Sequence, residues 1–344
     1  MGSYQTSTLR KVREQRVLHE VMLELTYNCN LDCFYCYNDR DKPGQALSLE
    51  QYRELLRDLA GMQTLFLTLT GGEPMVHPDF FAIAGYAREL GFVIRVRSNG
   101  HTLGERQCAR LATEVEPYMV EVSLHGASAA THDRQTRIAG SFERLCRNIG
   151  HARDAGLRMS VVSTPTAWNE HEIDDMFALC DSLGVPLRFQ GPVAPRDNGD
   201  LQPLQIQPQR ATWDLIERRM AGSQTDSRLD CDSPAADAEE KAMCGVGVSG
   251  VDIDPYGNVQ ACMHLQEAAG SLHEQSIADI WHSSPVFVRA RQRSVAAAKQ
   301  FENASPRQLD APVFCIAVEE NLHKQGAKAC GGCGTGGGCS EGSC

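Results

Sequence analysis

Short apolar, β-branched segments alternate with longer amphipathic segments over roughly the first 190 residues. The apolar segments predict strands at 21–25, 64–69, 92–97, 119–124, 157–162 and 185–189. The intervening segments predict helices near 48–60, 78–90, 103–112, 141–155 and 169–183. Strands and helices that alternate in this way form a parallel sheet. Six such units in about 190 residues favour an α/β fold with a partial, open-sided (β/α)6 TIM-like barrel over a closed eight-stranded barrel.

The pattern changes after residue 189. A Pro- and Gln-rich segment leads to a predicted helix at 211–221, and the chain is rich in Cys and Gly from Cys231 onward. Within that part, 250–262 predicts a hairpin with its turn at 255–258. We therefore expect an N-terminal extension at 1–18, the barrel at 19–225 and a cysteine-rich domain at 226–344. The last part has little apolar mass, so metal would have to stabilise it, the alternative being a disordered tail.

The composition argues against some classes of binding partner. With 42% hydrophobic and 22% charged residues among 344, the chain can bury a sizeable core. Its 33 Lys and Arg against 44 Asp and Glu give a net charge of -11, and no basic run is interleaved with aromatic residues, so nucleic acid is not an expected partner. No apolar stretch approaches the roughly 18 residues needed to cross a bilayer, and no hydrophobic signal core opens the chain. We expect a cytoplasmic protein without a membrane partner.

The 14 cysteines indicate metal or redox chemistry more than a disulfide framework. Three of them follow the first predicted strand on one loop: Cys29, Cys33 and Cys36. Three others lie in step with Leu and Phe on amphipathic segments and are expected in the core: Cys108, Cys146 and Cys180. Eight lie in the last third: Cys231, Cys244, Cys262, Cys315, Cys330, Cys333, Cys339 and Cys344.

The loop cysteines have a spacing of three and then two intervening residues. A 4Fe-4S cluster normally takes four thiolates, so three thiols on one loop leave one iron open to a substrate. The alternative is a structural zinc site, which would need a fourth ligand such as His77 or His125, both distant in sequence.

This loop resembles the signature of the radical S-adenosylmethionine (radical SAM) enzymes, in which the same spacing follows the first strand. Gly71-Gly72-Glu73-Pro74 after the second predicted strand resembles the family's methionine-binding turn. The resemblance implies that one 4Fe-4S cluster and S-adenosylmethionine (SAM) bind here, with a 5'-deoxyadenosyl radical abstracting a substrate hydrogen. It implies the following SAM-binding residues: Tyr35, Gly71, Gly72, Glu73, Pro74, Ser98, Asn99 and Ser123.

Other positions keep two interpretations. The segment that begins at Ser123 resembles the peptide-modifying branch, in which the residue two after that serine is often acidic but is His125 here. Four residues could either act in the site or lie on a surface loop: His125, His132, Arg137 and Asn169.

The carboxyl-terminal cysteines resemble the SPASM extension of the same family. Twelve residues separate Cys244 from Gly257 and four more precede Cys262, while Cys330-x2-Cys333-x5-Cys339 resembles the later signature. The resemblance implies two auxiliary 4Fe-4S clusters, the first using Cys244 and Cys262 and the second using the later three cysteines. The family usually places its next cysteine after three intervening residues, whereas here four residues separate Cys339 from Cys344. The missing ligands could be Cys231 and Cys315, or Asp310 or His323, or one iron could stay open.

An auxiliary cluster can accept an electron during a substrate oxidation or bind a substrate atom directly, and the sequence does not separate these. Met263 follows Cys262 where the sulfatase-maturing branch carries an acid, which disfavours formylglycine formation. A redox-neutral epimerisation would need a thiol hydrogen donor, for which Cys231 and Cys315 are candidates.

The resemblance implies an enzyme that crosslinks or otherwise modifies a ribosomally made precursor peptide, reduced by a flavodoxin- or ferredoxin-type partner. Only about 20 residues precede the first predicted strand, so we expect a separate leader-peptide recognition protein. One alternative is a radical SAM dehydrogenase or modifier of a small molecule, such as a carbohydrate or cofactor precursor. A non-enzymatic alternative is an iron-sulfur electron carrier.

Overall fold

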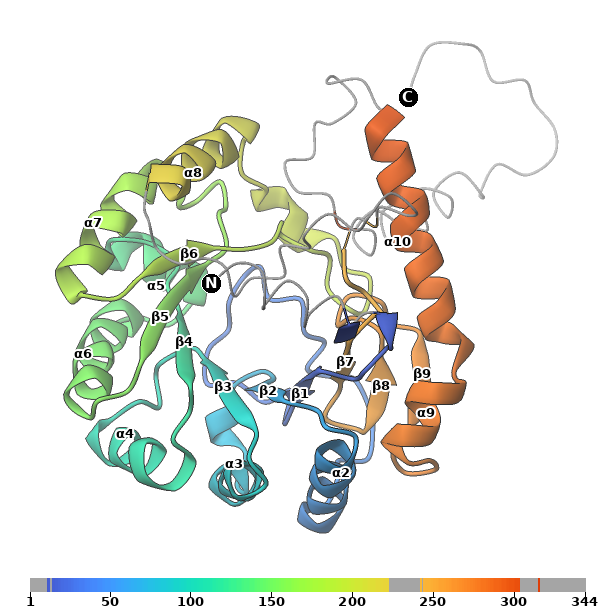
Figure 1. Ribbon diagram of the computed structural model, residues 1–344. Coiled ribbons are helices and arrows are strands. Elements are labelled where there is room, and N and C mark those ends of the chain that lie inside the picture. Colours follow the sequence, from blue (N-terminus) through green and yellow to red (C-terminus); the bar gives the residue numbers. More distant parts are fainter. Residues whose placement is uncertain (1–10, 13, 223–241, 243, 304–314, 316–344) are drawn as a thin grey trace.

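The computed structural model describes residues 11–12, 14–222, 242, 244–303 and 315. Six parallel strands form its main sheet, in chain order. They are β1 (Glu20–Glu24), β2 (Phe66–Thr70), β3 (Val93–Ser98), β4 (Met119–Ser123), β5 (Met159–Ser163) and β6 (Leu187–Phe189). Each predicted strand is confirmed to within two residues at either end, and the strands curve into the open-sided barrel that the sequence predicts (Figure 1).

Helices follow the strands and stand around the outer side of the sheet (Figure 1). The predicted ones are confirmed as α2 (Leu49–Gly61), α3 (Phe80–Glu89), α4 (Glu105–Arg110), α6 (Ser141–Asp154), α7 (Ile173–Leu183) and α8 (Arg210–Gly222). A π-helical turn at Leu111–Val115 extends α4, and 3-10 turns lie at Pro74–Val76, Glu170–Glu172 and Gln202–Ile206. The sequence pattern does not predict α5 (Ala129–Thr136), because this short helix is polar and buries Thr, His and Gln where apolar residues are expected.

The described portion of the cysteine-rich part continues the sheet of the barrel. It contains β7 (Gly250–Ile253), β8 (Asn258–Gln260), β9 (Ala268–Ser271), α9 (Ile277–Ser283) and α10 (Pro285–Asn303). The predicted hairpin is confirmed, since β7 and β8 are antiparallel. In addition, β7 pairs in parallel with β1, with Val21 opposite Val251, so that one sheet of nine strands runs from β6 through β1 to β9. The segment that carries Cys244 and Cys262 is thereby attached to the strand that leads into the first cysteine loop.

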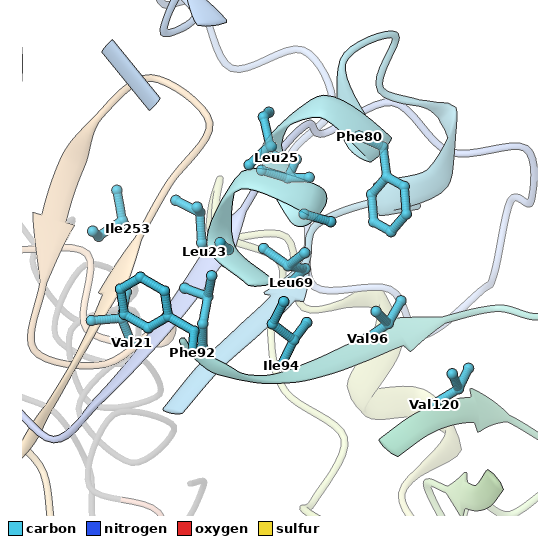
Figure 2. Close-up of a cluster of buried hydrophobic side chains, with 14 of the residues drawn as sticks. Val21, Leu23, Leu25, Leu69, Phe80, Phe92, Ile94, Val96, Val120 and Ile253 are labelled. Atoms are coloured by element: carbon cyan, nitrogen blue, oxygen red, sulfur yellow. The ribbon is translucent and has the colours of Figure 1, made fainter. Parts of the chain in front are cut away.

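Strand alternation separates an apolar outer layer from a polar interior. Figure 2 shows side chains of the outer layer, among them Val21, Leu23, Ile94 and Val96, which lie in the same buried cluster as Phe80 of α3. Cys108 and Cys180 are buried in this layer, as expected, and Cys146 is partly buried.

Several of the alternate strand positions are charged: Glu24 on β1, Arg95 and Arg97 on β3, and Glu121 on β4. None of the described helices is long and apolar enough to cross a membrane.

Candidate functional site

The loop that carries Cys29, Cys33 and Cys36 begins where β1 ends. Its first residues accept backbone hydrogen bonds from the turn after β2. Gly72 N donates to Thr26 O at 2.6 Å and Glu73 N donates to Asn28 O at 2.9 Å. A Cβ on Gly72 would lie 2.5 Å from the Asn28 carbonyl oxygen, and Gly71 has φ +138°. Both positions therefore require glycine for the approach of two backbone segments. The turn that resembles the family's methionine-binding turn therefore also fixes the entry to the cysteine loop.

Glu73 is fully buried, and its carboxylate accepts hydrogen bonds from other residues of the protein. It accepts hydrogen bonds from Ser98 Oγ at 3.0 Å, from Asn99 N at 2.7 Å and from Met75 N at 3.2 Å. Burial raises its pKa to about 7, while these hydrogen bonds act in the opposite direction. The structure thus brings together three of the predicted SAM-binding residues, Glu73, Ser98 and Asn99, with Glu73 holding the end of β3.

Asn99 connects that end of β3 to the cysteine loop. Its Nδ2 lies 3.5 Å from Cys29 Sγ and 2.6 Å from Asn30 Oδ1. The backbone N–H of Leu31 also donates to Cys29 Sγ, at 3.4 Å. Hydrogen bonds to sulfur are one of the means by which a protein tunes an iron-sulfur cluster.

The three loop thiols are free and partly buried. Burial raises the pKa of each of them, and the neighbouring Arg40 guanidinium acts in the opposite direction on all three. Three thiols on one loop, N–H donors to sulfur and a nearby cation are the donor set that an iron-sulfur cluster needs. The residues fit a cluster better than the zinc alternative, because His125 is bonded to Tyr35 and His77 Nδ1 accepts from Asp79 N.

The connection after β4 holds the same loop from the other side. Asp32 N donates to Thr136 O at 3.1 Å, and Phe34 N donates to Gln135 O at 2.9 Å. Tyr35 Oη lies 2.9 Å from Nδ1 of His125.

The surface-loop interpretation is therefore wrong for three of the four open residues. His125 and His132 are 2% and 1% exposed, and Asn169 is fully buried, with its Nδ2 donating to the His125 carbonyl at 3.3 Å. Arg137 is partly exposed, with its guanidinium over the Phe34 ring and 3.3 Å from Asp32. Ser123 is half-buried at the end of β4, opposite Val162 of β5.

Carboxylates gather at the junction of β1 and β7, which the sequence analysis did not predict. Glu24 is 5% exposed, accepts a hydrogen bond from Tyr37 Oη at 3.2 Å and lies near Asp252 and Asp197. Burial, and then these two carboxylates, raise its pKa to about 8. Burial also raises the pKa of Asp252, to about 7. The signal in the sequence was an acid inside an apolar strand segment, five residues before Cys29.

Three of the later cysteines lie among the described residues. Cys262 interacts electrostatically with Cys315 and Cys244, and burial is the main cause of its raised pKa. The fully buried Ser294 accepts from Cys244 N at 2.9 Å and lies 3.6 Å from its sulfur. The remaining predicted ligands lie outside the described residues: Cys231, Cys330, Cys333, Cys339 and Cys344, together with Asp310 and His323.

The fold and the donor set define a class: a partial-barrel protein whose cysteine loop is built for an iron-sulfur cluster. Residues 23–180 match the radical SAM superfamily and residues 244–306 match the SPASM iron-sulfur cluster-binding domain. The chain belongs to the radical SAM superfamily and carries a SPASM domain. It is an enzyme that binds SAM and a 4Fe-4S cluster, with additional iron-sulfur clusters in the SPASM domain. The electron-carrier alternative loses its support.

Relatives of known activity are similar over most of the chain. The mycofactocin maturase MftC of Mycobacterium ulcerans is 33% identical, over 80% of this chain and 77% of that protein. The PqqA peptide cyclase of Rhodopseudomonas palustris is 29% identical, over 79% and 75%. An AdoMet-dependent heme synthase of Methanosarcina barkeri is 26% identical, over 78% and 83%.

Solved structures share the fold. Streptococcus suis SuiB bound to the precursor peptide SuiA superposes with a TM-score of 0.66 at 13% identity, over 83% of this chain and 70% of SuiB. The anSMEcpe enzyme with bound AdoMet gives a TM-score of 0.62 at 13% identity, over 91% and 98%.

Proposed function

We propose that this enzyme modifies a ribosomally made precursor peptide by abstracting a hydrogen atom from it. The observation that carries the proposal is the similarity to a peptide maturase at 33% identity over 80% of the chain, together with a thiol loop held by the turns after β2, β3 and β4. The PqqA peptide cyclase and the SuiB complex with a precursor peptide support the same substrate class.

Cys29, Cys33 and Cys36 would hold the cluster, leaving one iron for the methionyl group of SAM. The residues around that iron would be Tyr35, Gly71, Gly72, Pro74, Ser98, Asn99 and Ser123. Glu73 would hold Ser98 and Asn99 in place by accepting hydrogen bonds from them. Bound there, SAM supplies a 5'-deoxyadenosyl radical when the cluster is reduced. The chain's own task is to align the cofactor with the substrate carbon and to exclude water.

The division of the chain at residue 225 remains part of the proposal, with 1–18 as an extension, 19–225 as the radical SAM barrel and 226–344 as the auxiliary domain. Cys244, Cys262 and Cys315 would supply ligands to one auxiliary cluster, supported by the electrostatic interaction of Cys262 with the other two. The later cysteines would supply the second cluster. An auxiliary cluster near the substrate would accept the second electron of a two-electron oxidation.

The proposal includes three further elements. A flavodoxin- or ferredoxin-type protein would supply the electron, and a separate protein would recognise the leader part of the peptide. The proposed location is the cytoplasm, since a cysteine-rich chain that holds iron-sulfur clusters would need a reducing compartment.

The test uses anaerobically reconstituted protein, SAM and dithionite with a short peptide encoded beside the gene. The expected result is 5'-deoxyadenosine formed in step with a loss of hydrogen mass from the peptide, and neither product with a Cys33→Ala variant. SAM cleavage that leaves every candidate peptide unchanged would overturn the peptide substrate but not the radical chemistry. If the wild type and Cys33→Ala both made no 5'-deoxyadenosine, the assignment of the cysteine loop would be overturned.

A second candidate is modification of a small cofactor precursor, favoured by the heme synthase relative. The same assay with a tetrapyrrole carboxylate in place of the peptide distinguishes the two. Mass loss from the tetrapyrrole but not from the peptide would favour this second function.

A further inference from the structure

The side chain of Tyr35, between Cys33 and Cys36, is hydrogen-bonded to the imidazole of His125, which belongs to a different part of the barrel. Its hydroxyl lies 2.9 Å from Nδ1 of His125, and the two rings meet edge to face with centroids 5.2 Å apart. His125 is 2% exposed and comes directly after the end of β4 and Leu124. The contact therefore joins the cysteine loop after β1 to the carboxyl end of β4, three strands away in the barrel.

A network of buried side chains from outside the loop fixes His125. Its backbone N–H donates to Nδ1 of His132 at 3.1 Å. Its carbonyl accepts from Gln135 Nε2 at 2.6 Å and from Asn169 Nδ2 at 3.3 Å. All three partners are at most 1% exposed. Because the backbone of His125 is held at both its donor and its acceptor, its imidazole is a fixed point to which Tyr35 is bonded.

The His125 imidazole is uncharged, and so is the His132 imidazole on which it stacks. His132 Nδ1 accepts from an amide, so that nitrogen has no proton and the His132 ring is neutral. The His125 ring stacks on it at 5.2 Å with an angle of 28° between the planes. Burial, and then His132, hold the pKa of His125 well below its ordinary value, in agreement with this geometry. Tyr35 thus gains a hydrogen-bond partner without a new charge beside the thiols.

The same connection also holds the loop at two backbone positions. Asp32 N donates to Thr136 O, and Phe34 N donates to Gln135 O. These bonds hold the chain on either side of Cys33. On the far side of Tyr35, Cys36 N donates to Cys33 O at 3.1 Å, which closes a tight turn around the tyrosine. The orientation of the Tyr35 side chain and the relative orientation of the two thiols are therefore coupled.

We propose that His125 is a positioning residue that acts through Tyr35 to set the conformation of the cysteine loop between Cys33 and Cys36. It contacts neither cofactor nor substrate in this role. The proposal concerns cofactor retention and is independent of which substrate the enzyme takes.

Four variants of the reconstituted full-length protein test it: Tyr35→Phe, His125→Leu, the double variant and His125→Gln. The measurements are the rate of iron release to a chelator and the EPR line shape of the reduced cluster with and without SAM, all without substrate. Loss of one hydrogen bond should speed iron release roughly three- to tenfold in each single variant. The double variant should be no faster than the faster single variant, since each single change already removes the bond between Tyr35 and His125. His125→Gln keeps an acceptor and should restore slow release and the wild-type line shape.

His282→Gln, an exposed substitution on α9, is the matched control and should leave both measurements unchanged. His125→Leu also disturbs the buried network, and Tyr35→Phe also removes the hydrogen bond between the hydroxyl and the Thr164 side chain, so the double variant and His125→Gln decide the outcome. The proposal is overturned if Tyr35→Phe releases iron at the wild-type rate. It is equally overturned if the effects of the two single variants multiply in the double variant, or if His125→Gln is as impaired as His125→Leu.

Discussion

Replacing Glu121 by Gln removes a negative charge that three arginines share inside the barrel. The Glu121 side chain is 2% exposed, with Arg97 Nε at 2.9 Å, Arg95 Nε at 3.7 Å and the Arg188 guanidinium in direct contact. The variant keeps the volume of the side chain. It leaves the three guanidinium groups, each about a quarter exposed, without this carboxylate.

Removing one partner of a buried ion pair destabilises a protein by about 3–5 kcal/mol. The partial exposure of the arginines favours the lower end, about 3 kcal/mol, which corresponds to a fall in Tm of roughly 6–12 °C for a domain of this size. Burial acts to raise the pKa of Glu121, but Arg97, Arg95 and Arg188 outweigh it and hold the pKa below 4.5. The stabilisation is therefore fully present above about pH 4.5 and is lost as the pH falls through the folded pKa.

Thermal unfolding of the reconstituted protein, followed by circular dichroism between pH 5 and 8, measures the effect. The difference between wild type and Glu121→Gln should be nearly constant over this range. Glu116→Gln is the control, because its partner Arg88 forms an exposed ion pair worth at most about 1 kcal/mol. Equal Tm values for Glu121→Gln and Glu116→Gln would refute the reasoning that the interior charges are coupled.

Three further outcomes are expected. The pKa of Glu24 is raised to about 8, chiefly by burial, so its stabilising contribution is lost as the pH rises through that value; Tm should fall less between pH 6 and 9 in Glu24→Gln than in the wild type, and equal slopes would contradict this. Lys42→Met leaves Asp254, 1% exposed, without the ammonium 3.1 Å away and should cost about 2 kcal/mol in a denaturation measurement, more than the Lys42→Arg variant. Asn99→Ala removes the amide near Cys29 Sγ and should lower the midpoint potential of the cluster in an EPR-monitored titration, with an unchanged potential ruling out the contact.

Much of the fold follows from local pattern. The six strands and the main helices were predictable because alternation and helical spacing are properties of short segments. The exception, α5, buries His132 and Gln135 in a polar network, and no periodicity of apolar residues marks it. The hairpin at the start of the cysteine-rich part was predictable from its turn. Its parallel pairing with β1 was not, since the partner strands are more than 200 residues apart.

Sequence alone determined the chemical character of this protein, because the spacing of Cys29, Cys33 and Cys36 on one loop needs no long-range contact to be recognised. Only the tertiary structure decided which polar residues serve that loop. It buried Glu73 behind Asn99 and gave Tyr35 a neutral imidazole partner. It also gathered carboxylates around Glu24 at the junction with β7. Burial and hydrogen-bond partners depend on elements that meet only in the folded barrel, so the same His or Glu is indistinguishable in sequence from a solvent-exposed one.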